Sequence, residues 1–156
     1  MKDYSKLLSG LAGECGVMKE LCLKGWVPSL AYNNCPTFDI FCHNPITNQT
    51  VAIQVKTVRE KIDKGKIGAF PLMGNRDERQ QFYNEVAGPY VFVYIDKLAN
   101  FEYYILSKEQ FITTSSKVEY DYDNLDRSKP IKLGSPMAMP KKEITQYKDC
   151  WDNLWL

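Results

Sequence analysis

The chain has 156 residues, of which 44% are hydrophobic and 25% charged, which is ordinary for one globular domain. Its 20 lysines and arginines balance 19 acidic residues, leaving a net charge of +1. That balance argues against bulk electrostatic capture of nucleic acid or membrane, but it permits a local basic patch.

The five cysteines form no C-x-x-C pair, which argues against a disulfide framework or a zinc site of usual spacing. We therefore expect free, buried thiols. The sequence shows neither the pattern of a signal peptide nor an apolar run long enough to cross a bilayer. The expectation is a cytoplasmic protein with no membrane partner.

The first predicted element is a helix from about residue 3 to 24, with Gly25 as its C-cap. Apolar residues recur along it at steps of three and four, which predicts one stripe facing the core. The residues of that stripe are Leu7, Leu8, Leu11, Cys15, Met18, Leu21 and Cys22.

Two strand-like segments follow, at 37–43 and 51–58. The turn-rich sequence NPITNQT between them predicts a hairpin. The polar stretch 59–75 is expected to be an exposed loop. Asn75 and Glu78 then have the spacing of a capping box that opens a short helix.

PYVFVYID and FEYYILS predict two more strands, the first of them central and covered on both faces. Ser107 and Gln110 open another short helix, and residues 115–139 are turn-rich. A last helix is predicted from Pro140 onward. Its expected buried stripe is Ile144, Tyr147, Trp151 and Leu154. This order predicts an α/β fold, a single domain over 1–156 with a central mixed sheet flanked by helices.

The hairpin gathers polar side chains on one face. Side chains alternate along a strand, so the apolar positions 51, 53 and 55 share one face and Gln54 and Lys56 share the other. Asp39 on the first strand then faces Gln54 or Lys56. This gathers an acid, an amide and an amine. The simpler alternative is an exposed strand face on which all three side chains are solvated.

Glu14 is a candidate fourth member of this group. On a helical wheel it lies about 60° from the centre of the first helix's apolar stripe. A carboxylate near a core-facing edge is costly unless a positive group meets it, and Lys56 or a divalent cation would serve. The alternative is a helix-edge acid paired with a surface lysine.

These residues resemble the PD-(D/E)XK nuclease superfamily, whose restriction-endonuclease-like core is a helix, a hairpin carrying an acid, and an acid-x-Lys triplet. Glu14 looks like the helix acid, Asp39 the hairpin acid, and Gln54-Val55-Lys56 the triplet. Most members carry Asp or Glu where Gln54 stands, but branches resembling Mrr-type enzymes carry Gln. The resemblance covers about the first sixty residues well and the later strands more loosely.

The resemblance implies an endonuclease that hydrolyses DNA phosphodiester bonds with Mg²⁺ or Mn²⁺. Asp39 would be the central metal ligand, and Glu14 would support it directly or through water. Gln54 and the Val55 carbonyl would add neutral oxygen ligands. Lys56 would orient the attacking water or stabilise the transition state. Because small units of this kind commonly act as symmetric dimers, a homodimer is expected.

Basic residues near the triplet are either DNA contacts or parts of a solvated loop. They are Arg59, Lys61, Lys64, Lys66, Arg76 and Arg79. His43 is interpreted as a turn residue. Two other functions remain open: a nuclease-like DNA-binding module without catalysis, which Gln54 favours, and an accessory interaction protein that keeps only the fold.

Overall fold

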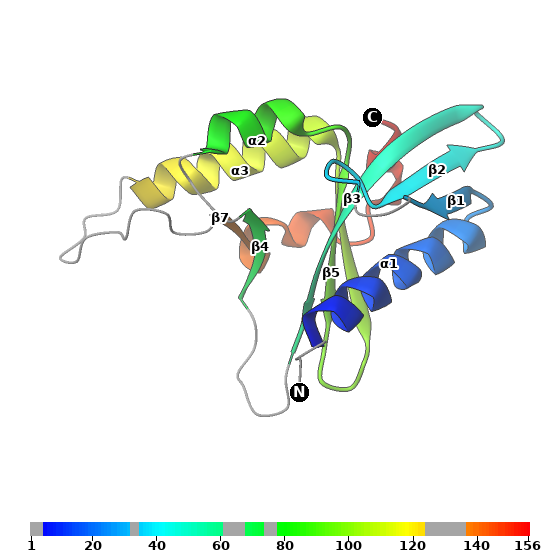
Figure 1. Ribbon diagram of the computed structural model, residues 1–156, viewed down its shortest axis with the longest axis horizontal. Helices are drawn as coiled ribbons and strands as arrows, with labels where there is room; N and C mark the ends of the chain where they lie inside the picture. Colours follow the sequence, from blue (N-terminus) through cyan, green and yellow to red (C-terminus); the bar gives the residue numbers. More distant parts are fainter. Residues whose placement is uncertain (1–4, 32–34, 61–67, 74–77, 124–136) are drawn as a thin grey trace.

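The computed structural model describes residues 5–31, 35–60, 68–73, 78–123 and 137–156. A mixed β-sheet lies at its centre, with helices packed against both faces (Figure 1). In chain order the elements are α1 (Ser5–Leu23), β1 (Val27–Leu30), β2 (Ile40–Asn44), β3 (Gln49–Arg59), β4 (Ala69–Met73), α2 (Arg79–Glu85), β5 (Tyr90–Ile95), β6 (Phe101–Leu106), α3 (Lys108–Asp123) and β7 (Met137–Pro140). Short 3-10 helices follow at Lys141–Glu143, Thr145–Tyr147 and Trp151–Trp155.

The central sheet has five strands in the order β1-β2-β3-β5-β6. Its longest strand, β3, is paired on different edges in its two halves. Residues 49–53 pair antiparallel with β2, whereas residues 54–59 pair in parallel with β5. Within the part of the chain that the structure describes, the edge of β3 that faces β2 is therefore without a strand partner beyond Ile53.

Alternate residues of β3 divide the core into two layers. Ile53 and Val55 lie beneath α1, in a cluster with Val17 and Leu21 of that helix. Val58 lies on the opposite face, in a cluster that also contains buried side chains of β4–β7 and α3. Gln54 and Lys56 belong to this second face, as the alternation of the sequence predicts.

The predicted buried stripe of α1 is correct for Leu21, which is buried, and in part for Met18, but it is wrong for the other five residues. The helix turns Gly13, Val17 and Leu21 toward the sheet and leaves Leu7, Leu8, Leu11, Cys15 and Cys22 exposed. Glycine explains the difference, because a helix without a Cβ at the contact can approach a strand closely. A Cβ built on Gly13 would lie 1.9 Å from Thr57 Oγ1, and one on Gly16 would lie 2.8 Å from the Tyr103 hydroxyl. The apolar pattern of the sequence counts large side chains, so it could not indicate a helix face that packs through Gly13 and Gly16.

Other expectations divide. Gly25 ends α1 with φ at 80°, and Ser107 and Gln110 form the reciprocal capping contacts of α3, both as predicted. The loop expected over 59–75 instead contains β4, which pairs with β7, and Asn75 lies outside the described residues. The last helix is replaced by the strand β7 and 3-10 turns. Strand β1 was not predicted at all.

Among the helices of the described residues, none is long and apolar enough to cross a membrane.

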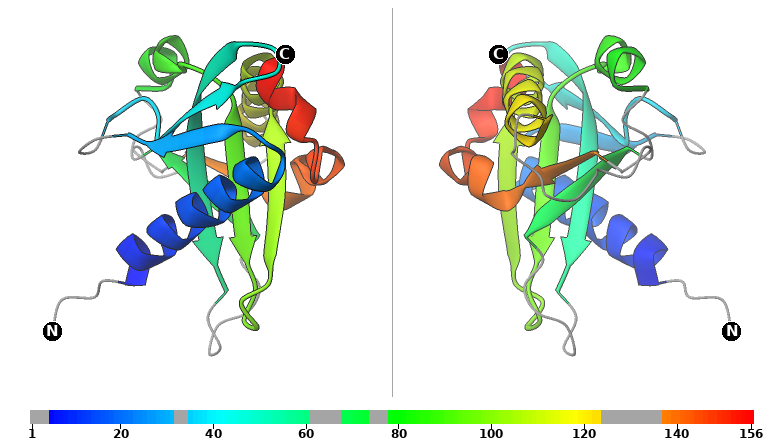
Figure 2. Two further views of the ribbon diagram at one scale, coloured as in Figure 1. Left: turned by 90° about the vertical axis from the view of Figure 1, so that its right-hand side faces the viewer. Right: turned by 90° about the vertical axis from the view of Figure 1, so that its left-hand side faces the viewer.

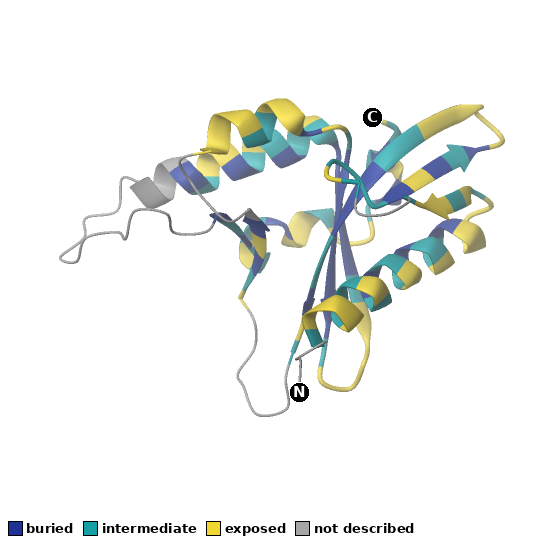
Figure 3. Cartoon of the chain, in the orientation of Figure 1, coloured by how far each residue is buried: buried dark blue, intermediate teal, exposed yellow. Residues whose placement is uncertain are grey.

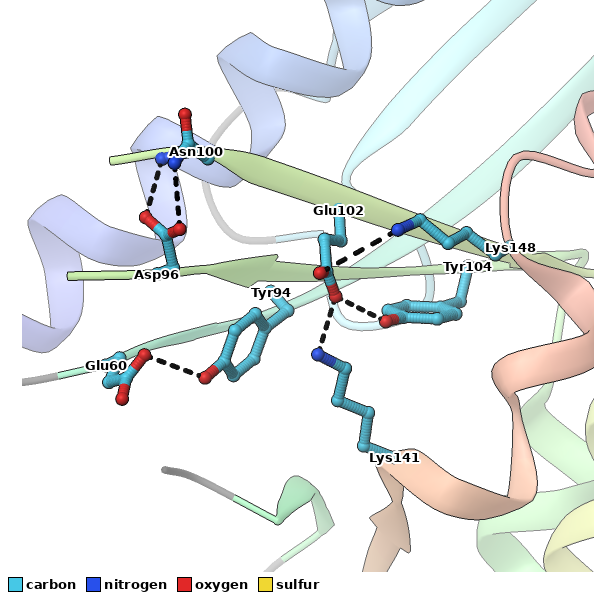
Figure 4. Close-up of polar contacts among 8 residues, drawn as sticks. All are labelled: Glu60, Tyr94, Asp96, Asn100, Glu102, Tyr104, Lys141 and Lys148. Atoms are coloured by element: carbon cyan, nitrogen blue, oxygen red, sulfur yellow. Dashed lines mark hydrogen bonds and ion pairs between the residues drawn. The ribbon is translucent and has the colours of Figure 1, made fainter. Parts of the chain in front are cut away.

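A network of charged and aromatic side chains ties the C-terminal segment to the sheet (Figure 4). One carboxylate oxygen of Glu102 on β6 accepts a hydrogen bond from the Tyr104 hydroxyl and forms an ion pair with Lys141, each at 2.5 Å. Lys148 pairs with its other oxygen at 3.7 Å. Burial acts to raise the pKa of Glu102, but its contacts with Lys141, Tyr104 and Lys148 hold it below the ordinary value.

This network predicts a pH dependence of stability. A depressed pKa in the folded state stabilises the fold at neutral pH, and that contribution is lost as the pH falls through the folded value. We expect Glu102→Gln to lower Tm at pH 7, and the difference from the unchanged protein to shrink between about pH 5 and pH 3. Thermal unfolding across that range checks it, with the exposed Glu78→Gln as control. A constant difference at every pH contradicts the assignment.

The glycine contact of α1 predicts a contrast between two substitutions. Gly13→Ala forces a methyl group onto Thr57, so we expect the free energy of unfolding to fall by about 1–3 kcal/mol. Gly10→Ala is the matched control, because nothing lies within 4 Å of its Cβ position, and it should leave stability unchanged or raise it by up to about 1 kcal/mol. Urea unfolding of both variants distinguishes them. If Gly13→Ala stabilises the protein as much as Gly10→Ala does, the close helix–strand contact is refuted.

Candidate functional site

Asp39 directly precedes β2, and backbone hydrogen bonds hold it on both sides. Its backbone N–H donates to the Ile53 carbonyl at 2.9 Å, and its carbonyl accepts from the Ala31 N–H at 2.8 Å. One carboxylate oxygen, Oδ2, accepts the backbone N–H of Val55 at 2.7 Å and also the side-chain amide of Gln54. Both the backbone and the side chain of Asp39 are therefore held in place.

The staggered pairing of β3 explains why Val55 is available to Asp39. In an antiparallel ladder, the N–H and C=O of one residue point to the same edge of the strand. Ile53 uses that edge to bind β2, and Val55 is the next residue directed to it, just past the last strand pair. The Asp39 carboxylate takes the place of the missing strand there. The Val55 carbonyl is directed to the same edge.

Gln54 is held from the other side. Its backbone N–H donates to the Pro89 carbonyl at 3.0 Å, and it is the register partner of Tyr90 on β5. Its side chain is 8% exposed and reaches Asp39. Gly88 permits the close approach of this segment, because a Cβ there would lie 2.1 Å from the Ala52 carbonyl. Asp39 thus meets Gln54, the first of the two partners that the sequence allowed.

Lys56 and Glu14 lie within electrostatic reach of Asp39. Burial lowers the pKa of Lys56, and the charge of Asp39 opposes that effect. Burial raises the pKa of Glu14, and the negative charge of Asp39 raises it further. The pKa of Asp39 is also raised by burial, against the opposing effects of the Val55 hydrogen bond and Lys56. Gln54 therefore contacts Asp39 directly, whereas Glu14 and Lys56 are linked to it by electrostatic interaction.

The position of Glu14 follows from the packing of α1. Gly13 contacts Thr57, which follows Lys56 on β3, so the next residue of the helix lies beside the same part of the strand. A larger residue at position 13 would hold this end of the helix away from the sheet. The acid reaches the site because its neighbour has no side chain.

Tyr90 is a member of the group that the sequence analysis missed. It is buried, and its ring stacks on Phe111 with centroids 3.7 Å apart and planes at 8°. Burial raises the pKa of its hydroxyl, and so does the charge of Asp39. Tyr90 therefore carries a neutral phenol beside the carboxylate. Only the parallel pairing of β3 with β5 brings it there.

The donors of this group fit a hard divalent cation. The described residues contain no cluster of three or more histidine, cysteine or acidic side chains that could hold a metal. They do contain two neighbouring carboxylates, on Glu14 and Asp39, together with the Gln54 amide and the Val55 carbonyl edge. Mg²⁺ is bound by oxygen ligands of these kinds. The negative charge of Asp39 disfavours the charged form of Glu14, and a bound cation would relieve that repulsion.

The other predicted residues divide. Arg59 is exposed at the end of β3, and Arg79 on α2 lies 3.9 Å from Glu119. His43 is in strand β2 and not in the turn, with Nδ1 3.2 Å from Thr50 Oγ1. The remaining basic candidates, Lys61, Lys64, Lys66 and Arg76, lie outside the described residues.

Solved structures that match most of this chain include a homing endonuclease and a Holliday junction resolvase. A bacterial homing endonuclease, I-Ssp6803I, matches with a TM-score of 0.53 and 15% sequence identity over 94% of this chain and 88% of its own. Hjc, a Holliday junction resolvase from Archaeoglobus fulgidus, matches with a TM-score of 0.42 and 16% identity over 88% of this chain and 93% of its own. No family model and no curated protein matches the sequence. The first likeness confirms the predicted fold class, a central mixed sheet flanked by helices.

The bridge between Asp39 and Val55 predicts unequal effects of two substitutions. Asp39→Asn and Asp39→Ala both remove the charge, but only asparagine keeps an oxygen that accepts the Val55 N–H. We expect Asp39→Ala to be less stable than Asp39→Asn by about 1–3 kcal/mol, because it leaves a buried backbone donor unpaired. Urea unfolding of the two variants measures this difference. Equal stabilities would show that the bridge does not hold the strands.

Proposed function

We propose that the chain is a metal-dependent endonuclease that hydrolyses phosphodiester bonds of DNA at the group formed by Glu14, Asp39, Gln54 and Lys56. The observation that carries this proposal is the Asp39 carboxylate held by the Val55 N–H and the Gln54 amide at the edge of β3, within electrostatic reach of Glu14 and Lys56. The likeness of the fold to that of a homing endonuclease supports it.

A bound Mg²⁺ or Mn²⁺ would stabilise charge on the phosphoryl oxygens and lower the pKa of a coordinated water. Asp39 is the residue best placed to hold the ion, because its carboxylate is oriented by the Val55 N–H and the Gln54 amide. Glu14 adds the second negative charge. The Gln54 amide and the Val55 carbonyl complete the set of oxygen donors.

Lys56 would interact with the attacking water and with the phosphoryl oxygens of the substrate. Burial lowers the pKa of the Lys56 amine, and the negative charge of Asp39 opposes that effect. An ammonium in this position donates hydrogen bonds to the attacking water and to the oxygens that gain charge in the transition state. We expect removal of the Lys56 amine to lower the rate of cleavage more than the free energy of unfolding, because Lys56 is only partly buried.

A second candidate is a DNA-binding module that does not cleave. The hydrogen bond from the Gln54 amide to Asp39 favours it, because that bond occupies an oxygen of the central carboxylate and Gln54 adds no negative charge. Such a protein would bind DNA with a strong salt dependence but would bind divalent metal weakly. The two candidates therefore differ in metal affinity and in cleavage.

The test is nicking of supercoiled plasmid and of branched DNA in Mg²⁺ or Mn²⁺. We expect cleavage that EDTA abolishes and that falls at least about 100-fold in both Asp39→Asn and Lys56→Ala. Asp39→Asn is chosen because it keeps the Val55 contact, and Lys97→Ala, on the exposed turn before β6, is the matched lysine control.

Two results would count against the proposal. Cleavage that survives both substitutions would place the chemistry at a different site or in a contaminant. The absence of cleavage, with salt-sensitive DNA binding and no heat of metal binding by calorimetry, would support the non-catalytic module. Gln54→Glu then offers a further check, since an added carboxylate should strengthen metal binding to a genuine site.

A further inference from the structure

The outer side of α1 carries an apolar seam that its own sheet does not use. We call it the α1 seam: Leu8, Leu11, Cys15, Met18 and Cys22. Leu8 is 59% exposed and Leu11 44%, both cysteines are exposed, and only Met18 is partly packed against the core. Figure 3 shows these exposed stretches along the helix. A soluble surface seldom leaves this much apolar area together on one helix without a partner.

The seam has the spacing of a coiled coil. Its members are separated by three, four, three and four residues, which are the a and d positions of two heptads. The residues that pack on the sheet, Gly13, Val17 and Leu21, are on a different face of the same helix. In Figure 2, α1 crosses in front of the sheet, and no other described element lies over its outer side.

The charges of α1 favour a protein partner over a membrane. The helix carries two lysines and two glutamates, Lys6, Lys19, Glu14 and Glu20, and so has no net side-chain charge. An interfacial membrane helix usually adds a lysine- and arginine-rich polar face to its apolar one. Here the sheet covers the inner side, and little basic surface remains to meet anionic lipid.

The flanks of the seam are complementary to each other. Glu14 borders it at a g position and Lys19, with a 64% exposed side chain, borders it at an e position. When two copies of a helix pack side by side in parallel, the g flank of each meets the e flank of the other. An antiparallel pair instead places like flanks together, which brings the two Glu14 side chains toward each other.

We propose that the chain forms a homodimer in which the α1 seams of two copies pack in parallel as a short two-stranded coiled coil. The helix is already ordered by its contact with the sheet, so association does not bear the cost of folding it. A seam of two heptads is short, and we therefore expect a dissociation constant in the micromolar range. The proposal does not depend on the nuclease activity.

Sedimentation analysis without DNA or metal tests the dimer over micromolar to submillimolar concentrations. We expect Leu8→Lys and Leu11→Lys each to weaken association at least about tenfold, because each buries two charges in the symmetric interface. Ile46→Lys is the matched control, since this residue is 86% exposed and belongs to the turn between β2 and β3 and not to the seam. Circular dichroism confirms that all three variants remain folded, as expected for exposed positions.

Cysteine cross-linking tests the orientation. In a parallel pair, identical a positions meet, so variants that retain only Cys15 or only Cys22 should each oxidise to a covalent dimer. A variant that retains only Cys150, outside the seam, should not. A protein that stays monomeric at every concentration, or a dimer that Leu8→Lys and Leu11→Lys do not weaken, overturns the proposal. A dimer that neither seam cysteine cross-links overturns the parallel arrangement.

Discussion

One hydrogen bond, from the backbone N–H of Val55 to the carboxylate of Asp39, fixes the geometry on which the candidate site depends. It exists because β3 is paired with β2 in its first half and with β5 in its second, on opposite edges. The side chain of Asp39 extends the ladder one step past the last strand pair. A charged group is thereby positioned by backbone pairing, which is the most rigid support that a sheet provides.

The burial of this group gives it a chemical character that a surface cluster would lack. Glu14, Asp39 and Lys56 are each partly removed from water. Burial raises the pKa of the two carboxyl groups and lowers that of the amine, so in each it favours the neutral form. With all three ionised, the cluster would carry one net negative charge in a poorly solvated position. Such a cluster gains more from a bound cation than exposed carboxylates do, because the attraction is less screened. Burial of these charged groups lowers the stability of the fold, and the same burial strengthens their attraction to a bound cation.

Sequence periodicity predicted the local part of this arrangement and missed the non-local part. Alternation along the hairpin was enough to place Gln54 and Lys56 on one face and to bring Asp39 opposite one of them, and the structure shows that its partner is Gln54. Tyr90 could not be found in that way, because it reaches the site only through a parallel pairing between distant segments. Strand β4 was missed for the same reason, since its partner β7 lies near the other end of the chain.

The error in α1 has a different physical origin and connects the two faces of that helix. Hydrophobic periodicity marks the stripe with the most apolar side chains, but the face of α1 that packs on the sheet combines Val17 and Leu21 with a glycine at the point of closest contact. Gly13 lets the helix backbone approach Thr57, and the larger apolar residues are left pointing outward. Glu14 borders both faces, with the site on one side and the exposed seam on the other.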